Sequence, residues 1–488
     1  MSVTRNTFYN LLGAMTPVAL ALITVPLYLD RIGEARYGVL AIVWLLLGYF
    51  GSFDLGLSRA TTNRIAQLRE AAAEEREQVF WTACLLNAAL GVAAGILFYV
   101  AGGWILGSWF KMSNSLHSEA RFALPWIAAA VPVATVTAAL TGALEGMQRF
   151  STVNAIQSLG TALFQIAPLI TAYSIGPQLQ YVIPAAVLMR FLTALPLVWA
   201  VKSELRLSGP PRLYWGQVRS LFAYGSWVAV TNIIGPILHT FDRFLIGIVL
   251  GASAVSYYVV PFQLVSRAQV LPSALSRALF PHLSQIDALE SQQIALRSVV
   301  TLAAVTTPLI ILGLLILWPF LQFWVGTTFA DRAAPVGEIL LLGIWVNGLA
   351  YVPLALLQAR GRPDIVAKFH LLELMPFLIF LWFALQRFGI VAAAVAWMAR
   401  VTADAILLFK GARLSTAIVR SLMPAVAFVV AAGVCTLMFP GAFNPVRLFA
   451  GATLLLLSIF WALATSTHLR TILLKLVCSL NVFAGNDY

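Results

Sequence analysis

Long apolar segments recur along the whole chain, and they limit its possible folds more than any other feature of the sequence. Each is about 20 residues long, the length that an α-helix needs to cross a bilayer. The 488 residues are 60% hydrophobic and only 10% charged, unlike a soluble globular protein. We predict an all-α polytopic membrane protein with about fourteen transmembrane helices, or twelve as the alternative count, at 8–30, 38–58, 79–100, 122–144, 152–174, 181–201, 222–249, 254–274, 298–318, 336–357, 369–386, 390–409, 421–439 and 447–465.

The basic residues indicate how the chain is oriented in the membrane. The chain has 31 Lys and Arg against 19 Asp and Glu, a net charge of +12. With both termini in the cytoplasm, most basic residues fall in cytoplasmic segments, which is the positive-inside asymmetry. We therefore interpret blocks such as Arg360-Gly361-Arg362 as topology signals, with contact to anionic lipid as a second interpretation. This distribution accounts for the charge without nucleic acid as a partner.

A polar linker divides the predicted helices into two groups of six. It follows the sixth helix and contains Gly209-Pro210-Pro211. We predict an N-terminal six-helix lobe at 1–205, a cytoplasmic linker at 206–219, a C-terminal six-helix lobe at 220–415, and two further helices with a cytoplasmic tail at 416–488. A helix–turn–helix around Gly33 and Tyr37 is echoed around Gly251 and Tyr257, as in transporters built from parallel repeats. The last two helices carry no charge in their apolar cores, so we interpret them as packed toward lipid.

Several other function classes lack their sequence requirements. The three cysteines, Cys84, Cys435 and Cys478, are far apart and predict neither a disulfide framework nor a metal site. The chain has no Gly-x-x-x-x-Gly-Lys-Ser/Thr loop for nucleotide hydrolysis. No loop is long enough for the catalytic domain of a membrane glycosyltransferase. We predict a protein that is not an enzyme and needs no cofactor, with its first apolar segment retained as a helix rather than cleaved as a signal peptide.

Four arginines inside predicted helices are the candidate substrate-binding residues: Arg190, Arg243, Arg267 and Arg400. All five lysines fall outside the predicted transmembrane helices, and we expect them in loops. A guanidinium stays protonated and binds phosphate through two parallel hydrogen bonds, so arginine suits the recognition of a buried phosphate. The competing interpretation is that each arginine pairs with a nearby acid or reaches to the interface. For Arg400 that acid is Asp404, four residues on along the same helix face.

Acidic and histidine side chains inside helices are candidates for carrying a coupling ion, H⁺ or Na⁺: Asp242, His239, Asp404 and Glu373. His239, Asp242 and Arg243 share one helix face. Adjacent Asp242 and Arg243 point about 100° apart, so we predict that they do not pair well. The alternative for this group is a structural hydrogen-bond cluster near Pro236. His370 is interpreted as an interfacial residue.

Aromatic residues give a weaker signal. The 14 Trp and 13 Tyr are explained first by the aromatic belts found at membrane interfaces. Three of them, Trp44, Tyr49 and Trp227, are candidates for lining a cavity in which a sugar ring stacks.

Short motifs along the chain carry a family resemblance. They are Gly33-Glu34 to Tyr37-Gly38, Asp54-Leu55-Gly56-Leu57, Asp242 with Phe244-Leu245-Ile246-Gly247, and Ala359-Arg360-Gly361-Arg362. Together they resemble the polysaccharide transporter branch of the multidrug/oligosaccharidyl-lipid/polysaccharide exporter superfamily, that is, the O-antigen and exopolysaccharide flippases. The chain departs from the family's commonest turn at Ser256, where a glycine is often found. Gly33, Tyr37, Gly38, Asp54 and Gly56 are the residues expected to serve the family's structure.

The resemblance implies a fold and a function. The expected fold is MATE-like, with two lobes around a central cavity and alternating access. The expected function is transfer of an undecaprenyl-pyrophosphate-linked oligosaccharide from the cytoplasmic to the periplasmic leaflet of the bacterial inner membrane. A glycan polymerase and chain-length machinery are the expected protein partners. The alternatives are a cation-coupled multidrug antiporter of the same superfamily and a flippase for the peptidoglycan precursor.

Overall fold

The structure is a computed structural model that describes residues 3–70, 72–219, 221, 240–439, 443–465 and 470. These residues form helices and their connections, and no strand occurs among them. Within this described part, 11 helices are long and apolar enough to cross a membrane. The predicted all-α polytopic class is therefore confirmed, whereas the count of fourteen stays a prediction.

Three features of the chain explain why the described count is lower than fourteen. The predicted helices 8–30 and 38–58 are joined in α1 (Val3–Tyr49), where only Gly33 is non-helical, with φ 79° and ψ 165°. Most of the predicted helix 222–249 lies outside the described residues. The predicted helix 254–274 is interrupted: α8 (Ala252–Val265) is followed by a 3-10 turn, η2 (Ser266–Gln269), and then by α9 (Val270–Leu283).

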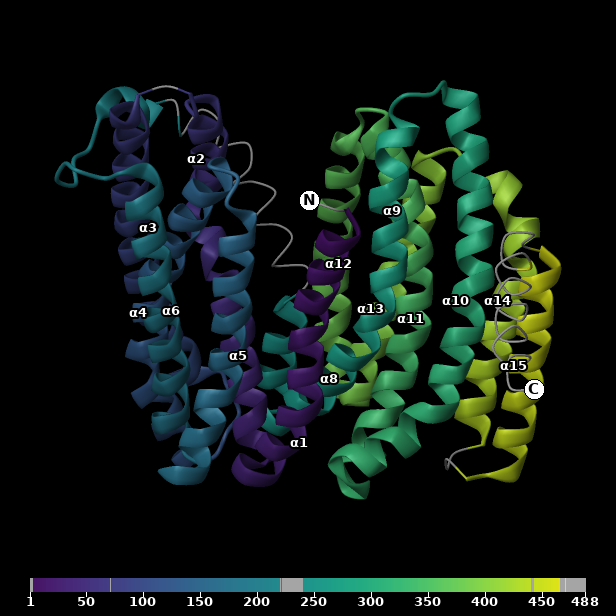
Figure 1. The fold of residues 1–488 in the computed structure, drawn as a ribbon. Helices are drawn as coiled ribbons and strands as arrows, with labels where there is room; N and C mark the ends of the chain where they lie inside the picture. Colours follow the sequence, from purple (N-terminus) through teal and green to yellow (C-terminus); the bar gives the residue numbers. More distant parts are fainter. Residues whose placement is uncertain are drawn as a thin grey trace, which may run out of the picture. The chain divides into compact units, whose positions relative to one another are not determined.

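The first compact unit spans Met1–Ser256. Besides α1 it contains η1 (Phe50–Asp54), α2 (Leu57–Gln67), α3 (Ala73–Ser108), α4 (Asn114–Gly146), α5 (Phe150–Ser174) and α6 (Leu179–Leu205). Helix α4 packs along α2, α3 and α6, and α5 packs against α6 and α1 (Figure 1). Buried aliphatic side chains from α2, α3, α4 and α6 form a core that includes Leu57, Ile65, Val79, Leu140, Leu144 and Val201.

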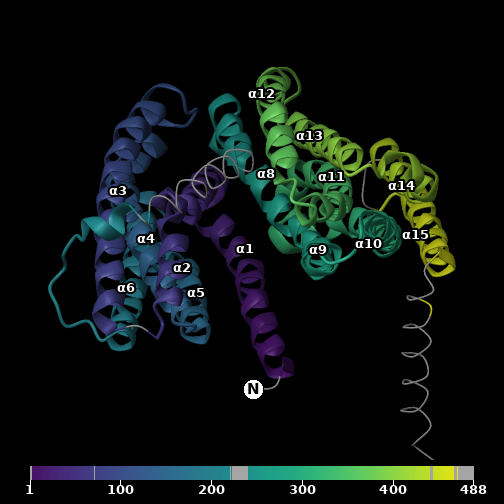
Figure 2. The same cartoon turned by 90° about the horizontal axis from the view of Figure 1, so that it is seen from above.

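The second compact unit spans Tyr257–Tyr488. It contains η2 and α9 followed by α10 (Ala288–Val325), α11 (Thr327–Ala359), α12 (Pro363–Phe388), α13 (Ile390–Gly411), α14 (Ser415–Met438) and α15 (Pro445–Thr465). Helix α11 is central, since it packs against α9, α10 and α13 (Figure 2). Helix α10 also packs against α14 and α15, and α12 packs against α13.

The predicted linker at 206–219 lies within the first unit and is held against α3. The backbone N–H groups of Ser208 and Gly209 donate to the Glu77 carboxylate at 3.1 and 2.8 Å, and that of Tyr214 donates to Thr82 Oγ1 at 3.1 Å. The two compact units divide later along the chain, between Ser256 and Tyr257. The lobe boundaries given above remain predictions, because residues 222–239 lie outside the described part of the chain.

The residues of the first family motif lie where α1 turns and packs. Gly33 has the positive φ that glycine adopts without steric cost. Tyr37 is fully buried. Gly38 lies against the start of α8, where an added Cβ would overlap the backbone carbonyl of Ala252. Glycine at position 38 therefore permits the close approach of the two backbones.

Replacing Gly38 with alanine is expected to destabilise the protein, because the obstructing atom is backbone and cannot rotate away. The matched control is Gly48→Ala in the same helix, where an added Cβ meets nothing within 4 Å and alanine favours the helix by about 0.5–1 kcal/mol. The measurement is the melting temperature of each purified variant in detergent. We expect Gly38→Ala to melt well below wild type and Gly48→Ala to match or exceed it; equal melting of the two variants would contradict the packing described.

The second family motif caps a helix. The buried Asp54 carboxylate accepts the backbone N–H of Gly56 at 2.8 Å and that of Ser58 at 2.9 Å. Leu55 and Gly56 both have positive φ, at 49° and 79°. The carboxylate therefore satisfies N–H groups at the start of α2 that have no partner within the helix.

Candidate functional site

Arg190 lies in a polar pocket of the first unit. The pocket has a volume of about 510 Å³ and is lined from α1, α4, α5 and α6. The Arg190 guanidinium lies over the ring of Phe164, 5.1 Å from its centroid. Amides and hydroxyls provide the rest of the polar lining, namely Gln157, Gln165, Thr137, Thr161 and Thr193.

The charge of Arg190 has no acidic partner in the described part of the chain. Among the residues that the structure describes, its guanidinium forms no ion pair. Gln165 Oε1 is buried there without a hydrogen-bond partner from the described residues. A half-buried cation beside amides and hydroxyls is suited to bind an anion that also carries hydroxyl groups.

Aromatic rings extend from this pocket into the core of the first unit. Trp44 lies 6.2 Å from Phe164, 5.2 Å from Tyr28 and 6.1 Å from Tyr37, measured between ring centroids. The Tyr28 hydroxyl donates to the backbone carbonyl of Gln165 at 2.7 Å. The predicted aromatic Trp44 is thus part of the wall behind Phe164. Tyr49 follows it in α1, and Trp227 lies outside the described residues.

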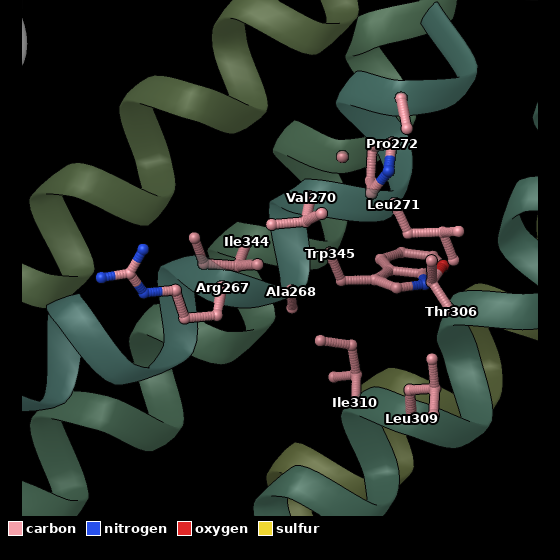
Figure 3. Close-up of a pocket in the computed structure, with 12 residues that line it drawn as sticks. Arg267, Ala268, Val270, Leu271, Pro272, Thr306, Leu309, Ile310, Ile344 and Trp345 are labelled. Atoms are coloured by element: carbon pink, nitrogen blue, oxygen red, sulfur yellow. The ribbon is translucent and has the colours of Figure 1, made fainter. Parts of the chain in front are cut away.

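Arg267 lies in η2, at the edge of an apolar pocket of the second unit (Figure 3). This pocket has a volume of about 330 Å³, and its lining includes Ile310, Ile344 and Trp345. The Trp345 indole N–H donates to Thr307 Oγ1 at 3.1 Å. Figure 3 shows that the guanidinium of Arg267 points away from these apolar side chains. Arg267 is exposed and has no ion-pair partner among the described residues, so a positive charge borders an apolar recess.

Arg400 is engaged by an acid from the neighbouring helix. Its guanidinium lies 3.5 Å from the Glu373 carboxylate, which comes from α12. The predicted alternative acid, Asp404, instead faces His370, with Nε2 and Oδ1 3.6 Å apart. Helices α12 and α13 pack together and bring these residues into one cluster, which we call the four-residue cluster: His370, Glu373, Arg400 and Asp404.

The four-residue cluster carries more acid than base when His370 is neutral. Two carboxylates face one guanidinium, and Glu373, Arg400 and Asp404 are all buried. Side-chain atoms of His370, Glu373 and Asp404 that could bind a cation, one from each residue, lie within 4.8 Å of one another. Glu373 Oε1 and Asp404 Oδ1 have no hydrogen-bond partner among the described residues. One added proton or cation would balance the charge of the two carboxylates and one guanidinium.

Asp242 and Arg243 do pair, and our prediction that they would not is wrong. Arg243 Nη1 lies 3.4 Å from Asp242 Oδ1, and both residues are buried. The backbone N–H of Arg243 also donates to that carboxylate oxygen, at 2.8 Å. The two side chains diverge at Cβ, but the long arginine chain bends back to reach the short one. His239, predicted on the same face, lies outside the described residues.

Two ion pairs inside apolar helices were not predicted. Arg447 Nη2 lies 2.6 Å from Glu338 Oε1 and also donates to the Leu314 carbonyl. Arg36 pairs with Glu119 at 2.6 Å. Arg447 is only 3% exposed, so the first turn of α15 faces the interior of the protein. Our interpretation that the last two helices pack toward lipid is therefore wrong for this turn. A lone acid within an apolar helix, such as Glu338, was the signal that could have indicated a buried basic partner.

Removing one partner of the Arg447–Glu338 pair is expected to cost about 3 kcal/mol of stability, because a buried charge then has no partner. Glu338→Gln should lower the melting temperature of the purified protein, whereas Glu290→Gln, at an exposed position of the same unit, should leave it unchanged. The double variant Glu338→Gln/Arg447→Met should recover part of the loss, since it removes both charges. A Glu338→Gln variant as stable as the control would contradict this account of the pair.

The fold is shared with MATE-like transporters. An inward-facing multidrug resistance MATE family transporter of the MOP superfamily matches with a TM-score of 0.66 at 13% identity, covering 83% of this chain and 95% of that one. The lipid II flippase MurJ, in an inward closed conformation, matches with a TM-score of 0.60 at 15% identity, covering 92% and 97%. These matches show that the chain has a MATE-like fold, as the motifs predicted.

Sequence comparison identifies the family to which the chain belongs. The family model described as polysaccharide biosynthesis protein matches residues 3–287. A Shigella flexneri protein described as an O-antigen transporter is 30% identical over 409 residues, covering 84% of this chain and 97% of that protein. A Haloferax volcanii protein described as a low-salt glycan biosynthesis flippase is 26% identical over 185 residues, covering 36% and 38%. The chain belongs to the polysaccharide biosynthesis protein family, and the resemblance inferred from the motifs is confirmed.

Proposed function

We propose that this protein is a flippase that moves an undecaprenyl-pyrophosphate-linked oligosaccharide from the cytoplasmic to the periplasmic leaflet. The glycan would serve O-antigen or exopolysaccharide synthesis. Family membership supports the polysaccharide transporter class, and the names of the two relatives refer to O-antigen transport and to a glycan flippase. The lipid carrier and the mechanism are inferred from the arrangement of charged residues.

The pocket around Arg190 is the observation that carries this proposal. A diphosphate entering hydrocarbon needs its charge compensated, since an unpaired charge there is costly. The Arg190 guanidinium is half-buried, stacked on Phe164 and without an acidic partner among the described residues, so it is available to an anion. The amides and hydroxyls around it offer hydrogen bonds to phosphate oxygens and sugar hydroxyls.

Arg267 would act on the same ligand from the second unit. A lipid diphosphate is anionic at one end and apolar along its chain. Arg267 presents a positive charge beside the apolar recess of Ile310, Ile344 and Trp345 (Figure 3). The positive charge suits the anionic end of such a ligand, and the apolar recess suits its chain. We propose Arg190 and Arg267 as the main diphosphate contacts. Arg243 and Arg400, which are already paired with Asp242 and Glu373, would contribute only when those pairs open.

The four-residue cluster is the proposed coupling site. With His370 neutral its net charge is negative, and uptake of one proton would neutralise it. A proton is favoured over Na⁺ because Arg400 already occupies one side of the cluster and repels a second cation. Asp242 is a second candidate whose buried carboxylate lies in the first unit, and His239 remains a sequence-based candidate there.

The orientation follows from the distribution of basic residues. We propose that the protein spans the bacterial inner membrane many times with both termini in the cytoplasm. The two lobes would alternate access around a central cavity, and a glycan polymerase with its chain-length machinery would act after the transfer. Neither a cofactor nor nucleic acid has a part in this scheme.

Reconstituted vesicles test the proposed function directly. Vesicles that contain only this protein should move a fluorescent polyprenyl-pyrophosphoryl sugar between leaflets faster than protein-free vesicles. The two alternatives predict different cargo: a multidrug antiporter would move organic cations against a cation gradient, and a peptidoglycan-precursor flippase would prefer the lipid-linked precursor peptide. Transport of organic cations without transport of the lipid-linked sugar would refute the proposal.

A further inference from the structure

A second basic site lies at one end of the second unit and includes the Arg360-Gly361-Arg362 block noted in the sequence. A pocket of about 310 Å³ opens there and is lined by Arg360, Arg362 and Arg413 together with apolar Leu289, Leu357 and Ile365. We call it the basic pocket. Four membrane-spanning helices meet at it, because α10 and α12 begin there and α11 and α13 end there. The connection between α9 and α10 lies at this end of the unit (Figure 1).

The positive charge of the basic pocket exceeds the acid available to it. None of the described residues that line the pocket is acidic. Asp364 lies beside it, but this one carboxylate is shared between Arg362 at 3.2 Å and Lys368 at 3.4 Å. Arg360 and Arg413 have no ion-pair partner among the residues that the structure describes. Two of the three guanidinium charges are therefore uncompensated.

Arg360 is fixed in position although no acid holds it. Its Nη2 donates to the Ala288 carbonyl at 2.7 Å and to Ser291 Oγ at 3.0 Å. Its Nε is buried without a hydrogen-bond partner among the described residues. Burial, and then the positive charge of Arg413, lower the pKa of Arg360 below its ordinary value. An anion in the pocket would reverse the second effect and give the unused donors a partner.

We infer that the basic pocket binds the phosphate group of an anionic phospholipid. Three guanidinium groups supply charge-assisted donors of the kind that phosphate oxygens accept. The pocket lies where four helices of membrane-spanning length begin or end, so we place it near the lipid phosphates. Leu289, Leu357 and Ile365 add an apolar side that a free phosphate does not need and that the glycerol and first acyl carbons of a lipid do.

Lipid retention by the intact protein tests this inference. The full chain is purified from bilayers that contain phosphatidylglycerol and phosphatidylcholine in equal amounts, and bound lipid is counted by native mass spectrometry. Wild type should retain phosphatidylglycerol preferentially. Arg413→Asn should retain about tenfold less, because one charge-assisted hydrogen-bond donor is lost. Asparagine is chosen because Arg413 has a φ of 59°, a left-handed conformation that asparagine tolerates.

The chain offers a matched control for this substitution. Arg206 is also exposed, also has a positive φ, of 55°, and lies in the first unit outside the basic pocket. Arg206→Asn should retain lipid as wild type does; equal retention by Arg206→Asn and Arg413→Asn would overturn the site. In a second measurement, the melting temperatures of wild type and Arg413→Asn are recorded at increasing concentrations of inorganic phosphate alone. If millimolar phosphate stabilised wild type but not Arg413→Asn, the assignment to a lipid would be overturned. Neither measurement requires transport, so their outcome does not depend on whether the proposed transport occurs.

Discussion

Replacing Arg190 and Arg267 together with glutamine is expected to slow transfer of a polyprenyl-pyrophosphoryl sugar between leaflets by at least about a hundredfold. Each hydrogen bond to a charged group contributes about 1.5–3 kcal/mol, and two such losses correspond to a hundredfold or more. Neither arginine has an ion-pair partner among the described residues, so their removal leaves no buried acid uncompensated. The protein should therefore stay folded. The measurement is the transfer rate in vesicles, with the melting temperature recorded beside it.

Two further variants make this result specific. Arg190→Lys/Arg267→Lys keeps both charges but loses the planar fork, so an intermediate rate is expected. Arg121→Gln/Arg206→Gln removes two exposed arginines outside the pockets described and should transfer at the wild-type rate. If the glutamine double variant were folded and transferred sugar as fast as wild type, arginines 190 and 267 would have no part in carrying the diphosphate.

Glu373→Gln/Asp404→Asn is expected to abolish the dependence of transport on a proton gradient. A gradient of one pH unit supplies about 1.4 kcal/mol per proton, which corresponds to about a tenfold effect on accumulation. The amide side chains keep the size of the two acids but cannot release a proton. Because buried Arg400 then has no acidic partner, the melting temperature is recorded beside transport to show that the variant is folded. Accumulation with the gradient should then equal accumulation without it, measured in vesicles with an imposed pH difference.

The control for the coupling site is Glu290→Gln, an exposed acid in the second unit, which should preserve the full response to the gradient. A double variant that still responds tenfold to one pH unit would exclude Glu373 and Asp404 as proton carriers. If wild-type transport responded to a Na⁺ gradient and not to a proton gradient, the proposed ion would be wrong, but Glu373 and Asp404 would remain the proposed coupling residues.

The sequence predicted those features that depend on one segment at a time. Apolar length predicted most of the helices, and the first glycine motif predicted the turn at Gly33, because that turn is made by residues close together in the chain. The cap that Asp54 forms was not predicted, since the expected helix at 38–58 continued through it. Arginine in apolar segments predicted that Arg190 and Arg400 lie within helices, but it did not predict that Arg36 and Arg447 do. The features that were predicted are local properties, and they follow from helix geometry and the cost of charge in hydrocarbon.

The partners of those arginines could not be predicted from one segment. Spacing along α13 indicated Asp404 for Arg400, but packing of α12 against α13 supplies Glu373 instead. Arg447 finds Glu338 across the interface of α15 with the α10–α11 pair, more than a hundred residues away in sequence. The same reasoning explains Arg190: its pocket is assembled from four helices, so neither the pocket nor the absence of a nearby acid could be deduced from α6 alone.

Pairing therefore divides the four predicted arginines into two kinds. Arg243 and Arg400 lie beside carboxylates and are compensated within the protein. Arg190 and Arg267 each border a pocket and have no acidic partner in the described part of the chain. This difference, rather than depth in the membrane, indicates which guanidinium groups are free to bind an anionic ligand.

The affinity of purified protein for a short polyprenyl diphosphate tests the central claim most directly. Farnesyl diphosphate and the uncharged alcohol farnesol are titrated into wild type, Arg190→Gln and the control Arg121→Gln. We predict that Arg190→Gln binds the diphosphate at least about tenfold more weakly than wild type, that it binds farnesol equally well, and that the control matches wild type for both ligands. Equal affinity of wild type and Arg190→Gln for farnesyl diphosphate would contradict the account.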